Sequence, residues 1–349
     1  MKRYNNLYDK IYDMDNLREA HKNAKRGKSS YKEVQMVNSN EDYYLYNIHL
    51  MLKNKTYKTS EYINFEADDK GKIRKISKLP YYPDRIVHWA IMLQTKDIFE
   101  KTFIYDSYAS IPNKGTHKLI SKMNIAMQNK ENTAYCLKID IKKYFPNVDK
   151  QILKSMLRKK IKDLDLLWLF DEIVDSYDEG LPIGNYISQY LSNYYLTYFD
   201  HWVKEELKIK HYFRYMDDIV ILHSNKLELR IIRIKIDDYL KNNLNLKIKN
   251  NWQIFPTFIR GVDFLGYRLF GDYILLRKKI AQNIKDKCKL IKKRGVKEYD
   301  LNSIMSYMGW LMHCNSYNFA KKYVNPIIGR IKKHEQIVKH KQTNRLLAS

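Results

Sequence analysis

The chain has 349 residues and a mass of 42.2 kDa, enough to bury a large core and to form two or three domains or subdomains. Lys and Arg total 64 against 39 Asp and Glu, a formal charge of +25, with 44% hydrophobic residues. These values exclude a disordered chain and predict a polyanionic partner. The cysteines form no CxxC pattern and no apolar stretch is long enough for a membrane helix. We therefore expect no disulfide framework, no zinc site, no membrane span and a cytoplasmic location.

The first part of the chain is basic and helical in its periodicity, over residues 1 to about 65. Solvated helix faces explain this segment best, although the charge cluster at residues 22–28 could also contact a nucleic-acid backbone. In residues 71–80, Lys72 and Arg74 alternate with apolar residues, which predicts a strand exposed on one face. A basic strand face can hold a triphosphate, and an ordinary surface strand explains it equally well.

A helix follows, which Pro83 and Asp84 open, over residues 81–93. His88 has no second ligand at a metal-binding spacing, so we expect it to pack in the core. A loop of small residues then precedes another helix, predicted over residues 118–129.

The next strong signal is a single acid in an apolar strand, predicted over residues 135–141. Asp140 lies in this buried run, where a carboxylate is costly unless it is paired. A metal site is the favoured explanation, and a satisfied buried carboxylate is the alternative. Helices are predicted next over residues 148–160 and 164–176.

A loop turning into a long helix is predicted over residues 180–202, with Gly184 allowing a close approach of the backbone and Ser188 as the N-cap. Two strands joined by a tight turn follow over residues 211–222, with Asp217 and Asp218 at the tip. Adjacent carboxylates in an apolar hairpin repel each other and lose solvation, and a divalent cation would relieve both effects. The alternative is a polar turn without further function.

Strands are predicted again over residues 252–276, and helices from residue 278 to a basic tail after Arg330. A sheet could bring the three acids Asp140, Asp217 and Asp218 to one edge. Ligands that are all oxygen atoms select Mg²⁺ or Mn²⁺ over zinc. Two such ions about 4 Å apart stabilise the attacking and leaving oxygens of a phosphoryl transfer, so these acids predict nucleotidyl transfer.

Taken together and in this order, the motifs resemble those of the reverse transcriptases. Residues 215–218 are similar to the catalytic hairpin of that family, and residues 137–145 to its first acid motif. Residues 181–189 resemble the template and nucleotide loop, and residues 264–267 resemble the primer grip. Arg74, Asp84 with Arg85, and the loop at 107–117 resemble finger motifs, so the resemblance covers roughly residues 65–320.

The resemblance implies an α+β right-hand polymerase fold with fingers, a palm with an antiparallel sheet, and a helical thumb. The N-terminal extension and fingers would occupy residues 1–134, the palm 135–276, and the thumb with its basic tail 277–349. The implied activity is RNA-directed DNA polymerisation, with an RNA template, a DNA or RNA primer and dNTPs as partners.

The resemblance also implies roles for individual residues. Asp140 and Asp217 would hold two Mg²⁺ ions, for which Mn²⁺ could substitute, with the Ile141 carbonyl as a further ligand and Asp218 assisting. Phe145 matches the steric gate, an aromatic ring where a ribose 2′-OH would collide. The remaining nucleotide-binding residues would be Lys72, Arg74, Ile183 and Gly184, and the template and primer contacts would be Tyr215, Met216, Phe264, Leu265, Gly266 and Tyr267.

One departure from the family pattern suggests a subtype. Ile183 stands where most of the family has Gln, and Gln189 follows Ser188 where most have Pro. This pattern resembles the reverse transcriptases of diversity-generating retroelements, which misincorporate opposite adenine and for which a small basic accessory protein would be a further partner. Group II intron and retron enzymes are disfavoured. The alternatives are a phage-defence or other unclassified bacterial reverse transcriptase, and a catalytically silent RNA-binding scaffold.

Overall fold

The computed structural model of this protein describes residues 3–68, 73–297 and 299–331. Lys72 and the basic tail after residue 331 lie outside these described residues. The chain divides into two compact units, each assembled from separate segments. Unit 1 contains residues 1–113, 138–220 and 230–252, and unit 2 contains residues 114–137, 221–229 and 253–349. The predicted division into fingers, palm and thumb at residues 134 and 276 stays a prediction.

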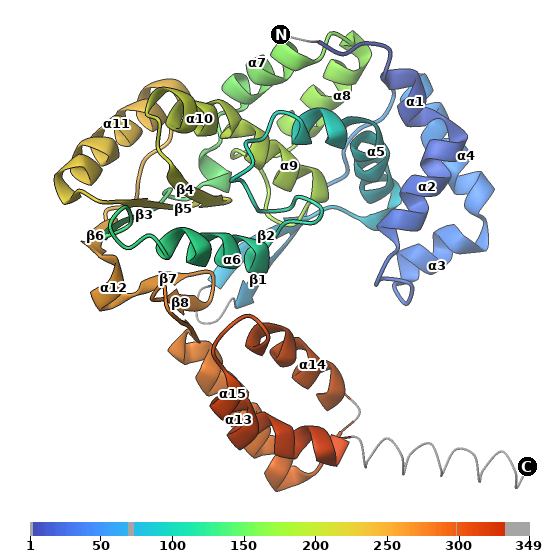
Figure 1. Cartoon of the computed structure of the whole chain (residues 1–349). Coiled ribbons are helices and arrows are strands. Elements are labelled where there is room, and N and C mark those ends of the chain that lie inside the picture. The colour runs from blue at the N-terminus through green and yellow to red at the C-terminus, as the bar shows by residue number, and fades with distance from the viewer. Residues whose placement is uncertain (1–2, 69–72, 298, 332–349) are drawn as a thin grey trace, which may run out of the picture. The chain divides into compact units, whose positions relative to one another are not determined.

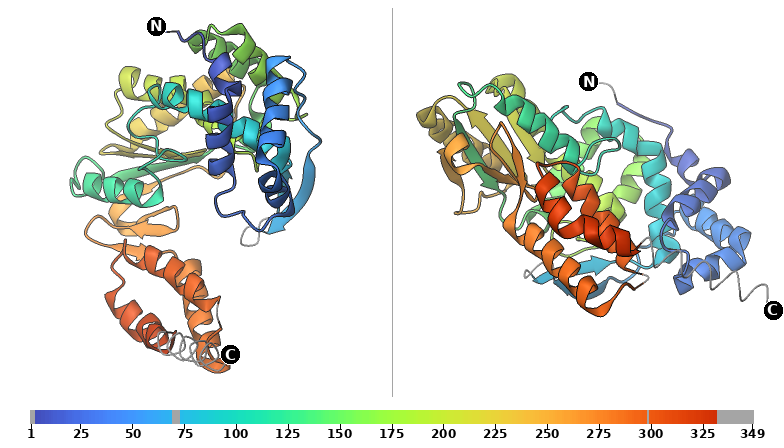
Figure 2. Two further views of the ribbon diagram at one scale, coloured as in Figure 1. Left: turned by 90° about the vertical axis from the view of Figure 1, so that its right-hand side faces the viewer. Right: turned by 60° about the horizontal axis from the view of Figure 1, so that its bottom comes forward.

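Unit 1 begins with helices that confirm the helical prediction for the first fifty residues: α1 (Tyr8–Tyr12), α2 (Met14–Ala24), α3 (Lys32–Ser39) and α4 (Glu41–Lys53). The Asp13 side chain caps α2 by accepting hydrogen bonds from the backbone N–H groups of Asp15 and Asn16. Helix α2 packs along the buried helix α5 (Ile86–Glu100), as Figures 1 and 2 show.

An antiparallel hairpin of β1 (Ile63–Asp68) and β2 (Ile73–Lys78) separates these helices from a helical turn, η1 (Tyr81–Arg85). Strand β2 is where a basic strand was predicted, and Arg74 is exposed on it opposite Ala67. The stretch predicted to be helical ran to about residue 65, so that prediction was wrong after α4, where a loop and the start of β1 follow. Pairing with β2 gives the backbone of β1 its hydrogen-bond partners.

Unit 1 continues with four further helices and two helical turns. They are α7 (Lys150–Lys160), α8 (Leu164–Asp175), α9 (Tyr186–Tyr195), α10 (Thr197–His201), η2 (Phe145–Asn147) and η3 (Trp202–Glu206). Asp149 and Asp163 cap α7 and α8 through their side chains. The prediction of Ser188 as an N-cap was wrong, because α9 already begins at Tyr186 and Ser188 is buried inside its first turn.

The central sheet has four strands in the order β4-β5-β3-β6. They are β3 (Tyr135–Asp140), β4 (His211–Tyr215), β5 (Asp218–His223) and β6 (Gln253–Pro256), and the long helix α11 (Lys226–Leu244) follows β5. The sheet confirms that residues 135–141 and 211–222 belong together. Ile219, Val220, Ile221 and Leu222 are all buried, so both faces of β5 are covered.

Unit 2 contains α6 (Thr116–Met127), α12 (Thr257–Arg260), and a separate antiparallel sheet of β7 (Val262–Phe264), β8 (Tyr267–Leu269) and β9 (Ile274–Leu276). Its helices α13 (Lys278–Arg294), α14 (Asp300–Leu311), α15 (Tyr317–Phe319) and the turn η4 (Ala320–Val324) share a small core that includes Ile284, Ile291 and Leu311.

Asp300 is buried in this helical part and forms ion pairs with Lys287 at 2.9 Å and Arg294 at 2.7 Å. Burial alone would raise the pKa of Asp300, but the two cations hold it well below its usual range. Within residues 3–331, gaps excepted, no helix combines the length and apolar character that crossing a bilayer requires.

Candidate active site

The three predicted acids come together in unit 1. Asp140 ends β3, Asp218 begins β5, and β3 and β5 are neighbours in the sheet. Met216 and Asp217 form the two-residue turn between β4 and β5. The Ile141 backbone N–H donates to the Asp217 carbonyl at 3.4 Å, which ties the end of β3 to the hairpin tip.

The charges at this edge of the sheet repel one another. The pKa of Asp217 is raised to about 6, first by burial, then by the neighbouring carboxylates of Asp218 and Asp140, while Lys249 acts in the opposite direction. Near neutral pH, ionised Asp217 is therefore held at a cost in free energy. An additional cation at this edge would relieve that cost.

Asp140 is only half satisfied. Its Oδ2 accepts a hydrogen bond from Lys249 Nζ at 2.5 Å, whereas its Oδ1 is buried and has no hydrogen-bond partner among the described residues. A buried carboxylate oxygen without a partner is costly. An oxygen in this state fits a positively charged ligand.

The backbone beside Asp140 also points towards the hairpin. Ile141 pairs with Ile248 in an antiparallel bridge whose hydrogen bonds are made by the flanking residues, from Lys142 N–H to the Lys247 carbonyl and from Lys249 N–H to the Asp140 carbonyl, both at 2.8 Å. In such a pair the N–H and C=O of the central residue both point away from the partner strand. The Ile141 carbonyl therefore lies on the same side as the N–H that binds Asp217.

These residues fit a divalent cation that prefers oxygen ligands. The candidate donors are carboxylates and one backbone carbonyl, which suit Mg²⁺ or Mn²⁺. Among the described residues, no three His, Cys, Asp or Glu side chains converge as a ready-made metal cage. Repulsion between the like-charged carboxylates opposes such convergence, and Lys249 already binds one oxygen of Asp140.

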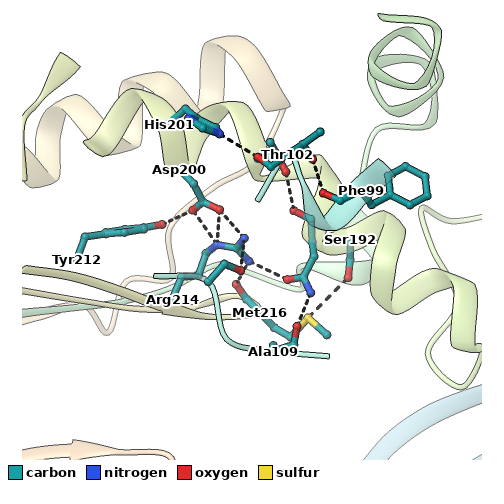
Figure 3. Close-up of polar contacts among 12 residues, drawn as sticks. Phe99, Thr102, Ala109, Ser192, Asp200, His201, Tyr212, Arg214 and Met216 are labelled. Atoms are coloured by element: carbon teal, nitrogen blue, oxygen red, sulfur yellow. Dashed lines mark hydrogen bonds and ion pairs between the residues drawn. The ribbon is translucent and has the colours of Figure 1, made fainter. Parts of the chain in front are cut away.

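A buried arginine that was not predicted from the sequence holds the hairpin that carries Asp217 and Asp218 (Figure 3). Arg214 on β4 is fully buried, and its Nε and Nη2 donate to the Asp200 carboxylate at 2.5 to 3.0 Å. Its Nη1 donates to Asn193 Oδ1 at 3.1 Å and to the Met216 carbonyl at 3.0 Å, and its Nη2 donates to Ser107 Oγ at 3.1 Å. One guanidinium thus joins the turn to α9, α10 and the loop before α6.

The charge of this arginine is well compensated. Burial alone would lower the pKa of Arg214, but the Asp200 carboxylate outweighs burial and holds that pKa above its ordinary value. The Tyr212 hydroxyl also donates to Asp200 Oδ1, at 2.6 Å. We call Arg214, Asp200, Asn193, Ser107 and Tyr212 the arginine hub.

Met216 needs such support, because its φ of 54° lies in the left-handed region that side chains other than glycine seldom adopt. A single residue held there costs about 1 kcal/mol. The hydrogen bond from Arg214 to the Met216 carbonyl holds the turn, and Ser192 Oγ contacts the Met216 sulfur at 3.8 Å. Tyr215 and Met216 are both half-buried.

Two backbone hydrogen bonds hold the predicted nucleotide-binding residues, one at Phe145 and one at Ile183. Half-buried Phe145 accepts a hydrogen bond on its carbonyl from Leu181 N–H at 2.9 Å. Gly180 permits this approach, since a Cβ there would lie 2.3 Å from the Phe145 carbonyl oxygen. The Ile183 carbonyl accepts from Ser77 N–H at 2.9 Å. Ile183 and Gly184 are thereby held against β2, the strand that carries Arg74.

The predicted primer grip, in unit 2, is a two-residue turn between β7 and β8. Leu265 and Gly266 both have positive φ, of 44° and 87°, as in the tight turns that match the twist of a hairpin. Phe264 and Tyr267 are 1% and 0% exposed, and the Tyr267 hydroxyl donates to the Trp310 carbonyl at 3.0 Å. These two side chains are core residues, so a primer could contact only the turn backbone and Leu265 here.

Arg214, Asp200, Gly180 and Lys249 were missed because each acts through a partner distant in the sequence. Arg214 offered one signal, a charged residue within an apolar strand and close to the acids. Lys249 offered none, in a chain with 64 Lys and Arg residues.

A comparison with known protein families identifies the family to which the chain belongs. The profile of the family described as "Reverse transcriptase (RNA-dependent DNA polymerase)" matches residues 56–269, more than half of the chain. The protein therefore belongs to the reverse transcriptase family.

Two relatives come from Escherichia coli. Protein YkfC of strain K12 is 27% identical over 243 residues, which cover 57% of this chain and 64% of YkfC, so the chain spans somewhat less than two thirds of that relative. The retron Ec73 reverse transcriptase is 23% identical over 273 residues, covering 73% of this chain and 83% of the relative. Retron enzymes, disfavoured by the loop at Ile183, are thus represented among the relatives.

Among solved structures, telomerase from Candida albicans in complex with the TWJ fragment of telomeric RNA aligns with a TM-score of 0.47 and 9% identity, over 76% of this chain and 58% of that one.

Proposed function

We propose that this protein is an RNA-directed DNA polymerase that copies an RNA template by two-metal nucleotidyl transfer. The observation that carries the proposal is the half-satisfied Asp140, whose buried Oδ1 lacks a partner beside the strained acid pair Asp217 and Asp218. Membership of the reverse transcriptase family supports the same reaction.

Asp140, Asp217 and the Ile141 carbonyl would hold the Mg²⁺ ions, and Asp218 would assist them. When bound, such ions stabilise the attacking and leaving oxygens of the displacement. The chain's own contribution is to fix the acids, through the sheet position of Asp140 and through the arginine hub that holds the turn. Preorganised groups of this kind cost no rearrangement when the reaction occurs.

The other residues would select and orient the substrates. Arg74 would bind the triphosphate of the incoming nucleotide, aided by Lys72, because a guanidinium binds phosphate oxygens with a planar fork. Phe145, held by Leu181 and Gly180, would exclude a ribose 2′-OH. The template and the primer would lie across Tyr215, Met216 and the turn at Leu265 and Gly266.

Primer extension tests the proposal. Purified protein with an RNA template, a DNA primer, dNTPs and Mg²⁺ should yield cDNA, and Asp217→Ala should abolish it. Asp272→Ala is the matched control, since Asp272 is an exposed acid paired with Lys130, and it should retain full activity. If Asp217→Ala extends primers as well as wild type does, the acids do not carry the reaction and the proposal fails; if wild type itself yields no cDNA, the RNA-binding scaffold is favoured.

We further propose that the enzyme is error-prone, as in diversity-generating retroelements. Ile183 is half-buried and cannot offer the side-chain hydrogen bonds of the Gln found in most of the family. Discrimination that depends on fixed polar contacts should weaken accordingly.

Sequencing cDNA copied from a template rich in adenine tests this subtype. Ile183→Gln should reduce errors opposite adenine, whereas the same change at Ile259, which is 85% exposed, should leave the error spectrum unaltered. An unaltered spectrum for Ile183→Gln would refute the error-prone subtype.

A further inference from the structure

Lys249 is bound to Asp140 by more than one contact. Its Nζ lies 2.5 Å from Asp140 Oδ2, and its backbone N–H donates to the Asp140 carbonyl at 2.8 Å. The segment that carries it is fixed too, because Asn245 Nδ2 donates to Asp149 Oδ2 at 2.7 Å and Leu246 N–H donates to the Leu240 carbonyl at 2.9 Å. Lys249 is therefore a fixed partner of the acid rather than a surface lysine that happens to lie nearby.

Its charge acts on Asp217 as well as on Asp140. Lys249 offsets part of the repulsion that Asp217 receives from Asp218 and Asp140. It leaves Asp140 Oδ1 buried and unpartnered. The ammonium group thus neutralises one of the acids but satisfies only one of the two oxygens of Asp140.

We propose that Lys249 is a positioning residue, an internal counter-ion that holds Asp140 in the metal-free enzyme and competes with a divalent cation for Asp140 Oδ2. This inference rests on the proposed function, because it concerns the same acids. A cation bound to both Asp140 and Asp217 must either displace the ammonium group or accept its repulsion at close range. Lys249 would therefore weaken metal binding while stabilising the metal-free fold.

Substitution of Lys249 separates this role from a merely structural one. Lys249→Met removes the charge and keeps the aliphatic length, and Lys249→Gln keeps a hydrogen-bond donor without the charge. Both variants should bind Mn²⁺ about tenfold more tightly than wild type, since removal of one nearby unit charge is worth about that factor at an intermediate dielectric constant. Both should also unfold at lower temperature in EDTA. A structural residue would leave Mn²⁺ affinity unchanged or weaken it.

The measurement is Mn²⁺ titration of the full chain, with free Mn²⁺ followed by electron paramagnetic resonance, and thermal unfolding in EDTA. Lys247→Met is the matched control, because Lys247 is exposed, carries the same charge and lies two residues away. It should change the affinity far less, and Lys249→Arg should keep the wild-type affinity. If both charge-removing variants of Lys249 bind Mn²⁺ no more tightly than Lys247→Met does, the inference is overturned.

Failure of the proposed function would look different. Wild type should bind Mn²⁺ and Asp217→Asn should not. If the two proteins bind Mn²⁺ equally, the acids do not form a metal site and both proposals fail together. If wild type binds, Asp217→Asn does not, and the Lys249 variants show no gain, only the role of Lys249 is wrong.

Discussion

Two aspartates in unit 1 show opposite solutions to the problem of a buried carboxylate. Asp200 is 0% exposed, and both of its oxygens receive hydrogen bonds within the arginine hub. Asp140 binds Lys249 through one oxygen and leaves the other buried without a partner among the described residues. The first arrangement is what a stable fold requires, whereas the second makes sense for a site that awaits a ligand.

The two aspartates have different roles, Asp200 in stability and Asp140 in the proposed function, although their sequence surroundings are similar. Both aspartates lie among apolar residues, so composition around them does not distinguish them. What distinguishes them is the number of satisfied oxygens and the sign of the neighbouring charges. Substitution by Asn, which keeps the shape and removes the charge, should therefore have different consequences at the two sites.

The largest effect is expected at Asp200. Asp200→Asn leaves the fully buried Arg214 without a carboxylate, which typically costs about 3 to 5 kcal/mol. Urea unfolding followed by circular dichroism measures this loss. A loss in the free energy of unfolding below about 1 kcal/mol would mean that the arginine hub does not hold the hairpin. Asp200 would then not be the structural acid that we contrast with Asp140.

A smaller effect is expected from Tyr212→Phe. This variant removes one hydrogen bond to Asp200 but leaves the ion pair with Arg214 intact. The expected loss is about 1 kcal/mol, the usual net value of one such bond. The same urea titration tests it, and a loss as large as that of Asp200→Asn would show that Tyr212, rather than Arg214, is the main partner of Asp200.

The smallest effect is expected at an exposed pair. Lys130 and Asp272 lie 2.7 Å apart, with side chains 55% and 62% exposed. Asp272→Asn should change the free energy of unfolding by less than about 0.5 kcal/mol, because solvent screens exposed ion pairs. A larger loss in the urea titration would show that exposure is a poor guide to the value of an ion pair in this protein.

Local patterns in the sequence were sufficient to predict the hairpin, the strand that ends in Asp140, and the gathering of three acids at one sheet edge. The turn had to place the adjacent acids at its tip, and alternation of apolar residues fixed the strands. The arginine hub was beyond such reasoning, because Asn193, Asp200 and Ser107 meet Arg214 only through the tertiary fold.

Other errors have similar causes. The predicted helical stretch ran to about residue 65 and so overlapped the start of β1, whose backbone pairs with β2, the next strand in the chain. Phe264 and Tyr267 matched a primer-binding motif by residue type, and their side chains are buried within unit 2, so contact with a primer stays a prediction for the turn between them. Residue identity predicts the chemistry a side chain can perform, whereas burial decides whether it can reach a ligand.

Asp217→Asn should relieve the strain that we infer for the acid site in the absence of a cation. The carboxyl of Asp217 should ionise near pH 4 when unfolded and near pH 6 when folded, so wild type loses stability as the pH rises from about 4 to 6 and stays lower above that range. Asp217→Asn lacks this loss. Allowing for solvent at this half-buried side chain, it should be more stable than wild type by about 2 kcal/mol at pH 7.5 in EDTA, with little difference at pH 3.5.

The measurement is urea unfolding of wild type and Asp217→Asn in EDTA at both pH values, with primer extension on the same preparations. We expect Asp217→Asn to be more stable than wild type at pH 7.5 and to yield no cDNA. A variant that is less stable than wild type at pH 7.5 would contradict this expectation, because Asp217 would then be a structural acid like Asp200.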